Sequence, residues 1–264
     1  MVLCHLHIIS LKDGITVGSF LRKLRQNGIK PVVQARAIRW MIRPTELSAS
    51  HLLSRNLRWD LFLILKEADS IPQSAQADIQ GIFSASCGVS SKALSGYAAI
   101  NTELLRPAPG SVAPPEPHQV SPSATSQKLE GSAELNEWIA GLPVEIRSHP
   151  VSMLNLLAFN SGKLDDYKKY GTEFAARVGS KHGGRVKIVG KVAGGQAQDH
   201  GWEEVAFVHY PSVQHFASMA ANKDYQEINH KYRLGALKDT LILCVMEIDD
   251  EGNLVNVRST REKL

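Results

Sequence analysis

Hydrophobic and polar positions alternate with a period of two in some segments of the chain and follow a helical period in others. In the N-terminal half, this pattern predicts strands over 2–11, 32–42, 57–65 and 97–105, and helices over 16–26 and 74–83. The predicted order of elements is βαββαβ.

The C-terminal half repeats this order in a different sequence. Strands are predicted over 151–159, 185–193, 204–210 and 240–248, and helices over 132–140 and 164–180. Two more helices are predicted before the last strand: Ser212 is expected to cap the first, and Asp224 with Glu227 is expected to form a capping box for the second, which ends near residue 237.

A segment rich in proline and serine separates the two halves. It holds half of the 12 prolines and almost no large apolar residue, so it is expected to be a flexible or extended linker. The predicted division is a first half over 1–106, a linker over 107–131, a second half over 132–250 and a tail over 251–264.

Each βαββαβ unit should form a four-stranded antiparallel sheet with both helices on one face. The other face is bare and must be covered. Two units in one chain can cover each other. The predicted fold class is therefore α+β, with tandem ferredoxin-like domains forming an intrachain dimeric α/β barrel around a ligand-sized interior. The protein would be a monomer with a pseudo-twofold barrel, or a homodimer.

Composition narrows the class of protein. Hydrophobic residues make up 43% and charged residues 21% of the 264 residues, which is ordinary for a soluble globular protein. No apolar run approaches the roughly 20 residues of a membrane-spanning helix, and the N-terminus lacks the features of a signal peptide. Three widely spaced cysteines indicate a reducing compartment. A cytoplasmic protein without a membrane partner is expected.

Positive charge gathers in the first half. Residues 1–106 carry 13 lysines and arginines against 7 acidic residues. The arginines around one predicted hairpin are Arg36, Arg39, Arg43, Arg55 and Arg58. They indicate either a solvated hairpin or an anionic ligand, since arginine pairs bidentately with carboxylate or phosphate. Of this region, Arg36 and Trp59 are the candidates for substrate binding. Aromatic residues are few and no nucleic-acid motif is present, so nucleic acid is not an expected partner.

The sequence contains no GxGxxG, P-loop, GxSxG or HExxH motif. Nucleotide cofactors and serine hydrolysis are therefore not supported. No organic cofactor and no metal are assigned.

The segment Cys4-His5-Leu6-His7-Ile8 places two histidines on one face of a strand. If Leu6 and Ile8 pack on helices, both imidazoles point into the barrel. They would then line the lumen, act in acid–base catalysis, or supply two ligands of a metal. Asn155 is the matching polar position on the first strand of the second half, and could lie near the two histidines.

Two further residues are candidates for substrate binding. His209 ends a predicted strand, and Arg233 lies in the last helical region. Arg233 is alternatively a structural ion-pair or capping residue.

Five segments between residues 138 and 248 resemble a known family. They read HPVSMLNLLAF, DDYKKYG, KHGGRVKIVGKV, WEEVAFVHYPSVQHFASM and DYQEINHKYRLGALKDTLIL. They are similar to uncharacterised dimeric α/β-barrel proteins with a ferredoxin-like domain. The N-terminal half shares only the order of elements. The resemblance implies the barrel fold, and a superfamily that contains cofactor-free monooxygenases, cyclases, isomerases, lyases and haem proteins. Fold alone is a poor guide to the reaction.

The resulting hypothesis is a small-molecule enzyme of secondary metabolism. It would act on an oxygenated, largely apolar metabolite inside the barrel by His and Asn acid–base chemistry, with His5, His7 and Asn155 as catalytic residues. The reaction would be that of a cyclase, isomerase, lyase or cofactor-free oxygenase. One alternative is a non-catalytic ligand-binding or stress-related module, and another is a metal- or haem-binding barrel protein.

Overall fold

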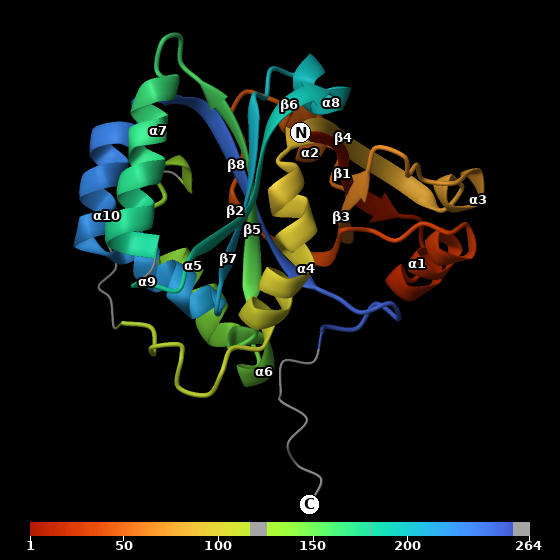
Figure 1. Cartoon of the computed structure of the whole chain (residues 1–264), viewed down its shortest axis with the longest axis horizontal. Coiled ribbons are helices and arrows are strands. Elements are labelled where there is room, and N and C mark those ends of the chain that lie inside the picture. Colours follow the sequence, from red (N-terminus) through yellow and green to blue (C-terminus); the bar gives the residue numbers. More distant parts are fainter. Residues whose placement is uncertain (117–125, 180, 256–264) are drawn as a thin grey trace, which may run out of the picture.

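Eight antiparallel strands close into one barrel in the order β1-β3-β2-β8-β5-β7-β6-β4 (Figure 1). The computed structural model describes residues 1–116, 126–179 and 181–255. Each half supplies four neighbouring strands, and the pairs β2–β8 and β4–β6 join the halves. The expected tandem ferredoxin-like barrel within one chain is confirmed.

The first half and its following helix contain eight elements. These are β1 (Val2–Leu11), α1 (Val17–Gln26), β2 (Val33–Ile42), α2 (Ala49–Leu52), β3 (Leu61–Lys66), α3 (Gln73–Gln76), β4 (Ile79–Val89) and α4 (Ser91–Leu105). Helix α1 begins as predicted, because the Thr16 side chain accepts a hydrogen bond from the Ser19 N–H. It ends at Gln26, before Gly28 with φ of 78°.

The second half begins after a short 3-10 turn, Ser126–Lys128. Its helices are α5 (Ala133–Gly141), α6 (Val144–Arg147), α7 (Leu164–Glu173), α8 (Gly195–Asp199), α9 (Val213–Ala221) and α10 (Lys223–Ile228). Its strands are β5 (Val151–Phe159), β6 (Arg185–Gly194), β7 (Glu204–Tyr210) and β8 (Leu237–Glu247). π-helical segments, Phe174–Gly179 and Asn229–Arg233, extend α7 and α10.

Three local predictions are wrong. The second half of the helix expected over 74–83 is replaced by the start of β4, where every second residue from Gly81 to Val89 is buried. Residues 97–105, which were expected to form a strand, are part of α4, whose sequence is rich in the helix formers Ala and Leu. The cap of α10 is Asn222, whose side chain accepts from the N–H groups of Asp224 and Tyr225, so Asp224 and Glu227 form no capping box.

The barrel interior is filled. Apolar side chains from both halves meet there, among them Leu6, Ile8, Phe62, Phe83 and Leu154. The void between them is about 10 Å³, which is at the lower limit for one water molecule. The expectation of a ligand-sized interior is therefore wrong for the described residues, because large and small apolar side chains from both halves together fill the space between the inward-facing positions.

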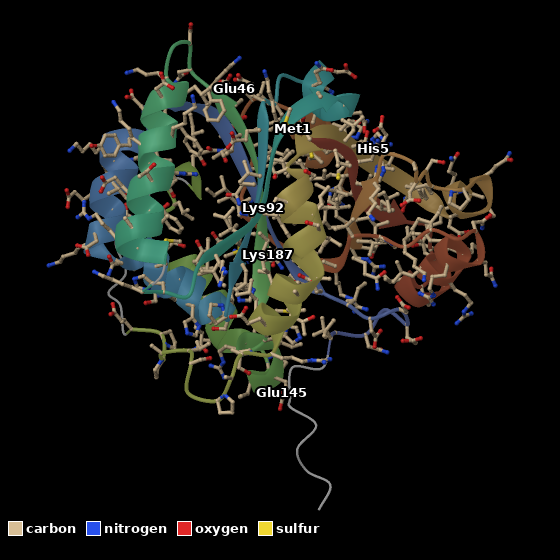
Figure 2. The ribbon with its side chains drawn as sticks, viewed as in Figure 1. Met1, His5, Glu46, Lys92, Glu145 and Lys187 are labelled. Atoms are coloured by element: carbon tan, nitrogen blue, oxygen red, sulfur yellow. The ribbon has the colours of Figure 1, made fainter. Side chains whose placement is uncertain are left out.

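A buried ion pair closes one end of the barrel. Lys187 contacts Glu247, and α4 lies over both, with Tyr97 and Asn101 hydrogen-bonded to the same carboxylate. In Figure 2, Lys187 is near the centre of the molecule. Burial lowers the pKa of Lys187, against the opposing effect of Glu247. Helix α4 follows the βαββαβ unit of the first half, and no helix follows β8 among the residues described up to 255.

The end of the expected linker contacts both halves. Gln127 donates to the backbone oxygens of Arg43 and Thr240, and Leu129 is buried in the core under α9 and α10. Residues 117–125 of the linker and 256–264 of the tail lie outside the described residues. Within the described part of the chain, no helix has the length and hydropathy needed to cross a bilayer.

Candidate functional site

The two histidines of β1 point out of the barrel. Cys4, Leu6 and Ile8 occupy its apolar interior, so the alternate residues His5 and His7 lie on the outer face. The expectation that they share one face holds, but their expected placement inside the barrel is wrong. Their catalytic role remains a hypothesis.

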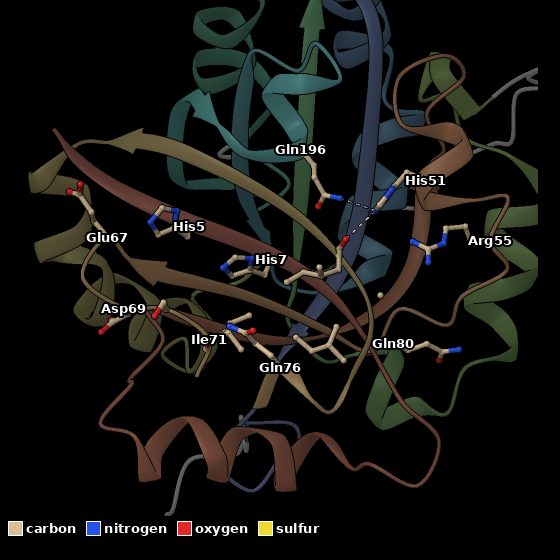
Figure 3. A pocket seen from close by; sticks show the side chains of 14 residues that line it. His5, His7, His51, Arg55, Glu67, Asp69, Ile71, Gln76, Gln80 and Gln196 are labelled. Carbon is tan, nitrogen blue, oxygen red and sulfur yellow. Dashed lines mark hydrogen bonds between the residues drawn. The ribbon is translucent and has the colours of Figure 1, made fainter. Parts of the chain in front are cut away.

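These histidines lie in a hollow with a volume of about 720 Å³ (Figure 3). Its walls combine imidazole, amide, apolar and charged groups. The lining residues are His5, His7, His51, Arg55, Glu67, Asp69, Ser70, Ile71, Gln76, Ile79, Gln80, Gly81, Ile82 and Gln196. The hollow is open to solvent on one side and is deep enough for a molecule of metabolite size.

Its openness follows from the short α3. In a βαββαβ unit the second helix covers the outer face of the first and fourth strands. Here that helix has four residues, Gln73–Gln76, so β1 and β4 stay uncovered over His5 and His7. Ile71 and Gln76, from the segment that contains α3, line the same hollow (Figure 3).

His5 is held by the neighbouring strand. Its ring nitrogen Nδ1 lies 2.9 Å from Ser86 Oγ on β4, directly across in the strand register. The His5 and His7 rings are stacked with centroids 6.5 Å apart. The Ser86 contact fixes the orientation of the His5 ring and leaves Nε2 for another partner.

His7 is kept neutral. Burial, and second the nearby His5, lowers the pKa of His7 to about 4. Its Nδ1 is buried and has no hydrogen-bond partner among the described residues. A neutral imidazole has one N–H donor and one acceptor, so His7 at neutral pH retains unused hydrogen-bonding capacity at the floor of the hollow. An unpaired buried polar atom is costly unless a ligand satisfies it.

The second half contributes one wall. Gln196 of α8 accepts from the Ser84 N–H at 3.0 Å, and its amide lies 3.3 Å from His51 Nε2. The same His51 nitrogen lies 3.0 Å from the Ile82 carbonyl oxygen. This approach requires Gly195, which has φ of 75° and whose added Cβ would lie 3.0 Å from the Ser84 oxygen. The site is therefore built across the joint between β4 and β6.

Charged groups stand at the rim. Arg55 lies on one side, and Glu67 and Asp69 lie on the other. None of these three forms an ion pair with another described residue. No group of three or more His, Cys, Asp or Glu side chains that could hold a metal ion occurs among the described residues.

Asn155 does not join the two histidines. It lies on the outer face of β5, in a separate cavity of the second half. Its amide donates to the backbone oxygens of Met153 at 2.9 Å and Ala206 at 3.3 Å. Both amide hydrogens are thus engaged, and the expected placement of Asn155 near His5 and His7 is wrong, because the two cavities have separate linings. A catalytic role of Asn155 stays a prediction.

The four residues expected to bind substrate are dispersed. Arg36 and Trp59 line a surface hollow of about 490 Å³, where Arg36 donates to the Gly252 oxygen and Trp59 to the Leu52 oxygen. His209 is buried in the barrel near Lys187, and burial lowers its pKa to about 3. Arg233 lines the same cavity as Asn155. These residues do not form one site.

The sequence alone did not point to His51 and Gln196. His51 comes from a four-residue helix, and Gln196 from the turn between β6 and β7. Neither belongs to a motif. The Gly194-Gly195 pair before Gln196 was the available signal, since adjacent glycines indicate a close backbone approach.

Comparison with known proteins does not assign this chain to a family. No protein-family model matches the sequence, and no curated protein matches it. Among solved structures, a protein of unknown function from Rhodopseudomonas palustris is 24% identical, covering 48% of this chain and 95% of its own, with a TM-score of 0.35.

Two further structures match nearly the whole chain. A protein from Lactobacillus acidophilus NCFM, named as a monooxygenase, is 8% identical over 94% of both chains, with a TM-score of 0.44. An anthrone oxidase-like protein is 9% identical over 100% of this chain and 95% of its own, with a TM-score of 0.41. At these scores the likenesses carry no argument about chemistry.

Proposed function

We propose that the hollow over β1 and β4 binds an oxygenated, largely apolar small molecule and exchanges a proton with it, without an organic cofactor. The observation that carries this proposal is the pair His5 and His7, placed in an open hollow of about 720 Å³ with one buried ring nitrogen of His7 unpartnered. Isoleucines supply the apolar walls, and imidazoles and amides supply the polar contacts.

The two imidazoles suit different roles. His5, with its ring fixed by Ser86, would take a proton from carbon next to a substrate carbonyl through Nε2. His7 stays neutral, because its pKa is about 4, and would donate its N–H to the carbonyl oxygen as negative charge develops there. Proton removal at such a carbon is a first step available to cyclases, isomerases, lyases and cofactor-free oxygenases alike.

The test is exchange of carbon-bound hydrogen for deuterium. The protein is incubated with 2-tetralone in D₂O at pD 7, and loss of the α-hydrogen signal is followed by NMR. Loss of a general base, or of a hydrogen-bond donor to the developing oxyanion, costs about 10²-fold or more in rate. His5→Gln and His7→Leu should each slow exchange by that factor, whereas Tyr170→Phe in the second half should not.

The outcomes separate catalysis from simple binding. Exchange that depends on both histidines supports the proposal. Chemical shift changes in the hollow without exchange would make the first half a non-catalytic ligand-binding module. Exchange that is equally fast in all three variants would refute the site.

A further inference from the structure

The second half contains a smaller cavity with a different character. It lies between the outer face of its sheet and α7 with its π-helical extension, and has a volume of about 150 Å³. Most of its walls are aromatic or apolar. The lining residues are Leu129, Met153, Asn155, Tyr167, Tyr170, Gly171, Phe174, Val186, Val189, Glu204, Ala206, Val208, Tyr210, Phe216, Met219, Arg233 and Ile242.

Arg233 is the one basic group in this wall. The residue is 2% exposed. Its Nη1 donates to the Gln127 backbone oxygen and to Asn229 Oδ1, both at 3.3 Å. Its Nη2 is buried without a partner, and no ion pair joins Arg233 to a carboxylate among the described residues. A guanidinium is always charged, and a buried charge without a counter-ion is strongly unfavourable.

The phenol rings around Arg233 do not neutralise it. Burial raises the pKa of Tyr167, Tyr170 and Tyr210, and the Arg233 charge opposes this rise at each of them. The phenols therefore stay protonated at neutral pH while lying close enough to feel the guanidinium. They can form walls for an aromatic ligand, but they provide no negative charge.

The cavity has an apolar entrance. Val186 and Val189 of β6 line it and are 49% and 45% exposed, which places them among the few exposed large apolar side chains of the described residues. Apolar side chains kept in solvent at a cavity mouth are typical of a ligand-binding groove.

Size, walls and charge together define a ligand class. A cavity of about 150 Å³ is large enough for a single benzene ring. The unpartnered Nη2 can donate to an anionic oxygen of a ligand. The planar guanidinium of arginine matches the geometry of a carboxylate. We infer that this cavity binds a small aromatic monocarboxylate, with the carboxylate on Arg233 and the ring among the tyrosines. This site is separate from the hollow of the first half and does not depend on the proposed function there.

The experiment is calorimetric titration of the full chain with benzoate, using benzyl alcohol as the neutral control. Arg233→Gln removes the charge and should weaken benzoate binding by about 10- to 100-fold, the range for hydrogen bonds to a charged group. Because Arg233 also supports the chain at Gln127, its variant is checked by melting. Ala206→Leu keeps Arg233 and fills the cavity from β7, so it should abolish binding while the fold is retained.

Two more variants locate the site. Glu204→Gln removes the only carboxyl group of the lining and should tighten binding. His7→Leu, in the other half, should bind benzoate like the unmodified protein. The inference is overturned if benzoate does not bind, if benzyl alcohol binds equally well, or if Ala206→Leu binds as before. Loss of binding in His7→Leu alone would place benzoate in the hollow of the first half and also overturn it.

Discussion

The two halves share one strand order but differ in what covers their outer faces. In the second half, α7, α9 and α10 with the π-helical segments pack over the sheet and leave about 150 Å³ (Figure 1). In the first half, α1 and the four-residue α3 leave about 720 Å³. The second half buries tyrosines under its helices, and the first half presents histidines in its gap.

This difference shows how one topology can yield two kinds of site. Because both sheets use their inner faces to fill the barrel, a ligand can only be accommodated on the outer faces. There, the longer helices of the second half leave a small, mostly apolar cavity, and the four-residue α3 of the first half leaves an open, more polar hollow.

The largest expected effect tests how differently helices cover the outer faces of the two sheets. Phe216→Ala, on the buried face of α9, should lower the free energy of unfolding by about 3–5 kcal/mol, since it empties a fully buried aromatic position. Ile82→Ala, at the half-buried wall of the hollow, should cost less than about 2 kcal/mol because solvent already reaches it. Denaturant titration measures both. Equal losses at the two positions would mean that the first half is covered as tightly as the second.

A smaller expected effect is the pH dependence of stability, which should differ between the contributions of His209 and His7. His209, 1% exposed in the barrel, has a folded pKa of about 3, whereas unfolded histidine has a pKa near 6.5. Between these values the unfolded chain binds the additional proton, so stability falls as pH falls, by up to about 1.4 kcal/mol per pH unit. His209→Leu should lose less stability than the unmodified protein between pH 6.5 and 4.

The same measurement on His7→Leu sharpens the comparison. The folded pKa of His7 is about 4, and the side chain is only partly buried, so the direction should be the same and the effect smaller. Parallel stability curves for His209→Leu and the unmodified protein would contradict the burial of that imidazole as a neutral group.

Much of the fold was predictable from the sequence. Strands β5 and β7 begin and end where the pattern predicts, because apolar runs and flanking turn residues mark both ends. In the first half, the prediction of secondary structure was wrong between residues 73 and 105. There, β4 is built from small residues such as Gly81, Ala85 and Cys87, and its weak alternation does not distinguish a strand from a helix.

The candidate site was predictable only in part. Alternation along β1 correctly put His5 and His7 on one face. It could not say which face, because Cys4, Leu6 and Ile8 would be equally compatible with packing in the lumen or under helices, and hydrophobicity does not distinguish these two environments. His51 and Gln196 reach the hollow through barrel closure, a tertiary contact that no local pattern encodes.

The most direct test of the central claim is the ring-nitrogen NMR titration of His7 and His209, with and without 2-tetralone. Both imidazoles should be neutral at pH 7, and His7 should titrate with a pKa of about 4. Addition of 2-tetralone should shift the His7 ring nitrogens and leave those of His209 unchanged, because only the first lies in an open hollow. A His7 pKa near 6.5, or a ligand response at His209 and none at His7, would contradict a site on the uncovered face of the first half.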